Sequence, residues 1–122
     1  MKLWLFVSAL VGLLAVILGA VAVHALRSRL DADALSVFET GAQYQMYHAL
    51  AMGLAAFAMR GPAARWAGWA AMSFLAGIIL FSGSLYLLAL TNSHALGIVT
   101  PFGGLFFMAG WGLLARAALL LP

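Results

Sequence analysis

The sequence predicts an all-α membrane protein, an up-down bundle of four transmembrane helices with both termini in the cytoplasm. Of its 122 residues, 66% are hydrophobic and only 7% are charged, whereas soluble domains are about half apolar and about a quarter charged. The apolar residues form four runs, each long enough for the roughly 20 residues that a helix needs to cross a bilayer. Only short segments separate these runs, so we expect residues 1–122 to form a single membrane domain.

The first two predicted spans meet at a short charged connection. The first span covers residues 3–26, carries no charge and ends before Arg27. It exceeds the ~7–15 apolar residues of a signal-peptide core, so we expect it to remain uncleaved. The second span covers residues 34–59. Asp31 or Asp33 is expected to cap it, because a carboxylate there can accept hydrogen bonds from free backbone N–H groups.

Proline and polar residues mark the ends of the last two spans. The third span covers residues 65–90, with Pro62 suited to the first helical turn. The polar segment Thr91–His94 then predicts a turn. The fourth span covers residues 101–121, and Thr100, which precedes a proline, is its expected N-cap.

The basic residues predict the orientation, because cytoplasmic loops of membrane proteins are enriched in lysine and arginine. In the four-span arrangement, four basic residues lie on one side: Lys2, Arg60, Arg65 and Arg116. Only Arg27 and Arg29 lie on the other. The side with four is therefore expected to be cytoplasmic.

Small residues recur along one face of each span. Lipid is as apolar as leucine, so helices associate in a bilayer through close approach at small side chains rather than through burial of leucine. The residues expected to pack helix against helix are Gly12, Gly19, Ala49, Gly53, Gly77, Gly103 and Gly110.

Uncharged polar residues gather in the half of the bundle that is expected to face the exterior. They come from the end of the first span, the start of the second, the end of the third and the start of the fourth. The sequence therefore predicts an exterior-side polar pocket lined by His24, Tyr44, Tyr47, His48, Ser82, Ser84, Tyr86 and Thr100. His48 lies roughly 10 Å inside the boundary at 1.5 Å per residue, and Tyr44 is one turn away on the same face.

Two interpretations of these polar residues stay open. They can simply join helices by hydrogen bonds, with modest gains of about 0.6 kcal/mol each. They can also form a site for a small ligand, a lipid or a partner subunit, because polar groups at this depth often mark functional sites.

Other function classes find less support. No catalytic constellation is present, so no enzyme is predicted. The absence of cysteine excludes thiolate metal sites, and the scattered basic residues do not form a nucleic-acid surface. No metal or cofactor is predicted, although two histidines from different helices leave a haem- or redox-associated subunit as an alternative. A small transporter or channel is a second alternative. The expected partner is the lipid bilayer, and small-residue faces also allow a membrane-protein partner or a homo-oligomer.

Four ordered motifs carry a resemblance to a known family. They are GAVAVHAL at residues 19–26, FETGAQYQMYHAL at residues 38–50, LFSGSLYLLAL at residues 80–90, and TPFGG at residues 100–104 with Gly110-Trp111 beyond it. Together they resemble the YgdD-like family of small multi-pass proteins of bacterial inner membranes, which has transmembrane relatives in eukaryotes. The resemblance covers essentially the whole chain. It implies four helices in the plasma membrane and no established biochemical activity.

Overall fold

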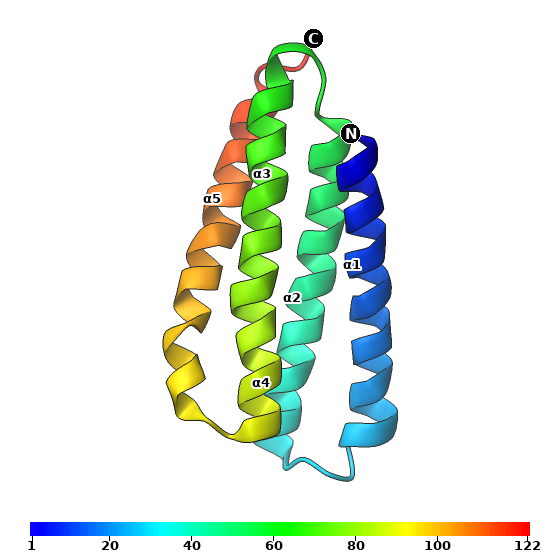
Figure 1. Ribbon diagram of the computed structural model, residues 1–122, viewed down its shortest axis with the longest axis vertical. Coiled ribbons are helices and arrows are strands. Elements are labelled where there is room, and N and C mark those ends of the chain that lie inside the picture. Colours follow the sequence, from blue (N-terminus) through cyan, green and yellow to red (C-terminus); the bar gives the residue numbers. More distant parts are fainter.

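The computed structural model describes all 122 residues, and nearly all of them lie in helices that run side by side (Figure 1). The first rod joins α1 (Lys2–Val21) to a π-helical turn η1 (Ala22–Leu26), and the second is α2 (Ala32–Phe57). The third begins with a 3-10 turn η2 (Gly61–Ala63) and continues through α3 (Ala64–Gly77), the π-helical turn η3 (Ile78–Ser82) and α4 (Gly83–Thr91). The fourth is a 3-10 turn η4 (His94–Ile98) followed by α5 (Thr100–Ala118). The all-α prediction is confirmed.

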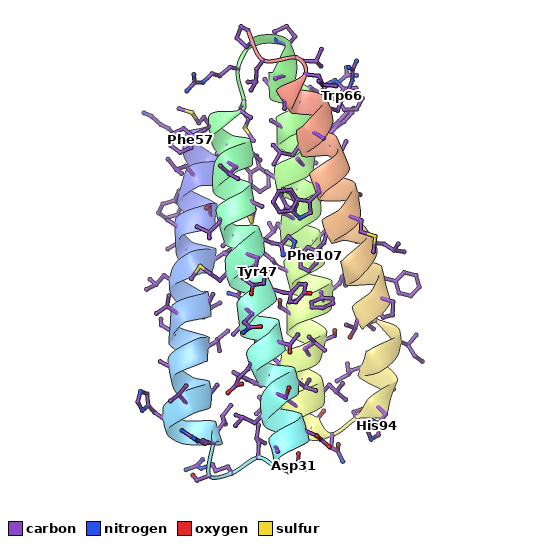
Figure 2. The ribbon with its side chains drawn as sticks, turned by 180° about the vertical axis from the view of Figure 1, so that it is seen from behind. Asp31, Tyr47, Phe57, Trp66, His94 and Phe107 are labelled. Carbon is purple, nitrogen blue, oxygen red and sulfur yellow. The ribbon has the colours of Figure 1, made fainter.

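Both termini lie at one end of the bundle, here named the terminal end (Figure 1). The connections at residues 27–31 and 92–93 lie at the opposite end, here named the loop end. Figure 2 shows the same separation, with Asp31 and His94 at the loop end and Phe57 and Trp66 towards the terminal end. Successive helices therefore run in opposite directions.

Of the helix N-caps predicted from the sequence, the structure confirms the one for α2 and contradicts the one for α5. The Asp31 carboxylate accepts a hydrogen bond of 2.8 Å from the Ala34 backbone N–H, which confirms an aspartate N-cap for α2. Asn92 ends α4 in the left-handed conformation with a φ of 55°. The prediction of Thr100 as N-cap of α5 is wrong. Thr100 is already helical, and its hydroxyl lies 2.6 Å from the Ser84 hydroxyl instead.

Three of the four rods are long and apolar enough to cross a membrane by length and composition. They are Lys2–Leu26, Gly61–Thr91 and His94–Ala118, with mean hydropathies of 2.7, 2.0 and 1.6. The rod formed by α2 falls outside this group because it carries more polar residues than any other rod. It also contributes more buried residues than any other helix. Two of its polar residues, Gln45 and His48, are therefore sheltered by protein.

The packing order explains why α2 is sheltered. α1 packs mainly against α2, α2 also packs against α3 and α4, and α5 packs against α3 and η3. Of the residues in α1, only Ala15 is buried. The leucine, valine and phenylalanine side chains of α1 are thus largely exposed, as expected for a helix surrounded by lipid.

Glycines bring α5 close to the third rod. Gly103 lies directly against the Phe81 backbone nitrogen, and Gly77 lies under the Phe107 ring. A Cβ on Gly110 would come within 2.6 Å of the Phe74 ring. Aromatic rings on one helix therefore fill the space left by glycines on the other.

The contact between α1 and α2 uses smaller groups. A Cβ on Gly53 would lie 3.1 Å from the Ser8 hydroxyl, and one on Gly12 would lie 3.9 Å from the Ala49 Cβ. Gly19 does not pack helix against helix as predicted, because a Cβ there would meet no heavy atom within 4 Å. The two helices diverge beside Gly19 and leave open space.

Candidate functional site

The structure buries three of the eight residues that the sequence assigns to a polar pocket. His48, Ser82 and Ser84 are at most 5% exposed, and Tyr86 is partly buried. Gln45, which is absent from the predicted set, is equally buried at 2% exposure.

Gln45 links three rods by hydrogen bonds. Its side-chain nitrogen donates to the Val11 carbonyl oxygen of α1 at 2.9 Å, and its oxygen accepts from the Tyr86 hydroxyl of α4 at 2.7 Å. The Tyr86 ring also lies over Gly41, where a Cβ would approach to 2.8 Å. The sequence does carry a signal for this role, because Gln45 lies three residues before His48 and therefore on the same side of α2.

His48 uses both of its ring nitrogens inside the bundle. Trp111 donates from Nε1 to His48 Nε2 at 3.2 Å. Because an indole N–H can only donate, Nε2 accepts and the proton of the neutral ring resides on Nδ1. That nitrogen lies 2.8 Å from the Tyr44 carbonyl oxygen, to which it donates. The ring also stacks on Phe107, with 3.5 Å between centroids and planes 7° apart.

Tyr44 and His48, which the sequence places one turn apart on the same face, do contact each other. The two rings stack with centroids 6.0 Å apart, and the hydrogen bond comes from the Tyr44 backbone. The Tyr44 and Tyr47 side chains are 38% and 52% exposed and lie on the outside of the bundle. His24 is likewise exposed, on η1 near the loop end.

Two hydroxyls bridge the third and fourth rods beside η3. The Ser84 and Thr100 hydroxyl oxygens lie 2.6 Å apart, and Ser84 also donates to the Phe81 carbonyl at 2.9 Å. A π-helical turn interrupts the regular hydrogen-bond ladder, and this serine satisfies a carbonyl within it. Ser82, also in η3, is fully buried and its hydroxyl has no hydrogen-bond partner.

These polar residues fill the space between the helices and do not line a cavity. Three hollows are present, and none is lined by any residue of the predicted pocket. The physical reason is that Gln45, His48, Ser84 and Tyr86 all have hydrogen-bond partners among nearby side chains and backbone carbonyls. The buried residues of the cluster thus join the helices through hydrogen bonds.

A groove between α1 and α2 is the hollow that combines polar and apolar groups. It has a volume of about 290 Å³, is open to the outside, and lies towards the loop end. Its walls are formed by Ala15, Gly19, Val23, Glu39, Ala42, Gln43 and Met46. Glu39 and Gln43 are exposed and one helical turn apart on α2. Sequence reasoning missed this groove, because the open space beside Gly19 depends on how two helices diverge.

Residues suited to metal or haem binding are not brought together. No group of three or more histidine, aspartate or glutamate side chains is placed to hold a metal ion. The Nε2 lone pair of His48, which would bind iron, is occupied by the Trp111 N–H. His24 lies exposed on η1.

Known proteins resemble this chain over nearly all of its length. The model of a family described as "Protein of unknown function (DUF423)" matches residues 18–104. The UPF0382 membrane protein YwdK of Bacillus subtilis is 42% identical, covering 97% of this chain and 97% of the relative. The UPF0382 inner membrane protein YgdD of Escherichia coli K12 is 38% identical, covering 97% and 90%. A Staphylococcus aureus UPF0382 membrane protein is 43% identical, covering 96% and 95%. No solved structure matches the chain.

The helical rods, their apolar surfaces and these relatives define a small, all-helical protein of the bacterial inner membrane. Contact with the lipid bilayer follows from that location. The chain belongs to the DUF423 family, which includes the UPF0382 membrane proteins that it matches. The family resemblance inferred from the four sequence motifs is confirmed.

Proposed function

We propose that this protein is a non-enzymatic lipid-binding protein of the inner membrane, and that the groove between α1 and α2 holds one bilayer lipid. The observation that carries the proposal is the composition of the groove, in which Glu39 and Gln43 stand beside apolar and small side chains. A groove with this mixture on a membrane-facing surface suits an amphiphilic molecule.

The size and depth of the groove support this occupant. Ligand sites commonly enclose about 300–1,000 Å³, and about 290 Å³ would hold a head group or one segment of an acyl chain. Gly19 leaves one wall without a side chain, and its backbone borders open space. A lipid chain could therefore pass close to the α1 backbone.

We further propose that α2 also crosses the bilayer, which gives four spans with both termini in the cytoplasm. The support is geometric and electrostatic. α2 lies between α1 and the third rod, and these neighbours shelter its most buried polar residues, Gln45 and His48, from lipid. Lys2 lies at the start of α1, Arg116 lies in the last turn of α5, and Arg60 and Arg65 flank η2. The two termini and the connection between α2 and α3 all lie at the terminal end (Figure 1). The groove would then open towards the exterior leaflet.

Filling the groove tests the lipid-binding proposal. Gly19→Leu places a side chain in open space, so we expect the fold to persist and the bound lipid to be lost. Gly112→Leu is the matched control, because a Cβ on this exposed α5 glycine also meets nothing within 4 Å. Native mass spectrometry of protein released from lipid nanodiscs would count the retained lipids, and thermal unfolding would verify the fold.

The outcomes separate lipid from other occupants. Lipid retained by the wild type and by Gly112→Leu, but lost from Gly19→Leu, supports the proposal. Equal retention by Gly19→Leu would remove the groove as the site. Loss of a dimer or of a co-purifying membrane protein, instead of lipid, would assign the groove to a second copy or to a partner subunit.

A further inference from the structure

We infer that the groove selects a phospholipid with a primary-amine head group, whose ammonium binds the Glu39 carboxylate. This inference rests on the proposed lipid-binding function and names the chemistry of the lipid. Three features carry it: an unpaired carboxylate, a gradient of polarity along the groove, and a basic residue at its outer end.

Glu39 is a carboxylate without a cationic partner in the chain. It is eight residues from the Asp31 cap, or about 12 Å along the helix at 1.5 Å per residue. No basic nitrogen lies within 4.0 Å of its oxygens. A charged group within a transmembrane segment is costly unless it is paired. A cation supplied by the ligand would provide that pairing.

Polarity changes along the groove in the direction that an inserted lipid requires. On α2 the wall runs from Glu39 through Gln43 to Met46, away from the loop end. The antiparallel wall on the first rod runs from Val23 through Gly19 to Ala15 over a similar length. The head group therefore belongs at the outer, polar end, and an acyl chain belongs beside Gly19.

The charges at the outer end fit a zwitterion. Arg27 follows Val23 by four residues and begins the connection at the loop end, directly after η1. It can bind a phosphate, because arginine presents several donors to phosphate oxygens. Glu39 and Gln43 then offer acceptors to the ammonium. A primary ammonium donates three hydrogen bonds, whereas a quaternary choline donates none.

Competition among three phospholipids of identical acyl chains tests this inference. Nanodiscs would contain equal amounts of phosphatidylethanolamine, phosphatidylcholine and phosphatidylglycerol, with bound lipid identified by native mass spectrometry. We expect bound phosphatidylethanolamine to be enriched about tenfold over the other two lipids. Its ammonium can donate charge-assisted hydrogen bonds to Glu39, and such bonds are stronger than those between neutral groups. Glu39→Gln should keep bound lipid but lose this enrichment. Asp33→Asn, with the same charge change outside the groove, should keep it.

The controls separate failure of this inference from failure of the proposed function. Lipid bound without preference, or a preference unchanged in Glu39→Gln, would overturn the amine assignment and leave lipid binding intact. Absence of lipid from the wild type would overturn both. Should Glu39→Gln unfold, Gln43→Leu removes an acceptor from the same wall. Under the inference it lowers the enrichment, and an unchanged enrichment would contradict it.

Discussion

At the residue scale, His48 shows how a polar side chain is accommodated in an apolar bundle. Its ring is 5% exposed, donates to the Tyr44 carbonyl, accepts from Trp111 and stacks on Phe107. An unpaired buried polar group costs free energy, and this arrangement leaves none on the ring. The neutral form with its proton on Nδ1 is the one that these partners require. His48 therefore joins α2 to α5 as a structural element.

The buried hydrogen bonds of Gln45 should contribute to the stability of the fold. Gln45→Leu removes both of its hydrogen bonds and leaves the Tyr86 hydroxyl without its acceptor. We expect the free energy of unfolding to fall by about 1–3 kcal/mol, because a buried polar group loses its partner. Unfolding in detergent, followed by circular dichroism, measures this loss.

Gln43→Leu is the control for this change, because it makes the same substitution two residues away on the exposed surface of α2. Surface substitutions usually alter stability by less than about 0.5 kcal/mol. Equal losses in the two variants would show that the buried hydrogen bonds of Gln45 contribute nothing specific.

At the element scale, the contact between α5 and the third rod depends on glycine. Gly103 lies against the Phe81 backbone, which cannot move aside as a flexible side chain can. The contact falls at η3, where Phe81 lies within the π-helical turn and Ser84 bonds its carbonyl. Close backbone approach of this kind is how helices associate where lipid removes the usual hydrophobic driving force.

The adjacent glycines Gly103 and Gly104 should respond in opposite ways to substitution by alanine. Gly103→Ala should separate α5 from Phe81 and lower the free energy of unfolding by about 1–3 kcal/mol, a typical cost of overpacking. Gly104→Ala introduces the same methyl group where nothing lies within 4 Å. It should raise stability by roughly 0.5–1 kcal/mol, because alanine favours helix more than glycine does. Unfolding in detergent compares the two, and a Gly103→Ala variant as stable as Gly104→Ala would refute the contact.

At the scale of the whole molecule, the middle position of α2 keeps its buried polar residues, Gln45 and His48, away from lipid. Three rods have apolar surfaces suited to lipid, and α2 lies between two of them. The terminal end also gathers aromatic residues with basic ones. The Arg65 guanidinium lies 4.8 Å from the Trp69 ring centroid, and Arg116 lies 5.5 Å from that of Trp66. Tryptophan and arginine are enriched where helices meet the membrane surface.

Topology reporters test the proposed four spans. Reporters inserted at Ser28 and at Ser93 should both be exterior, while one fused after Pro122 should be cytoplasmic. The antiparallel arrangement of the rods and the four basic residues at the terminal end give this expectation. Insertions at Ser28 and Ser93 on opposite faces of the membrane would show that the third rod and α2 do not both cross it.

The sequence by itself determined the helical class, the membrane location and the ends of the rods to within a few residues, except that the fourth rod starts at His94 and not at residue 101. The reason is that hydrocarbon forces each backbone polar group to form its hydrogen bond within its own helix. Apolar composition and the residues that end helices are therefore enough to predict where the helices lie. Only the tertiary structure decided which polar residues satisfy one another and where the helices diverge. Gln45 and Trp111 meet partners from distant segments, and Gly19 borders empty space while Gly103 is tightly packed. Such pairings depend on the rotation and separation of whole helices, which no local pattern of residues specifies.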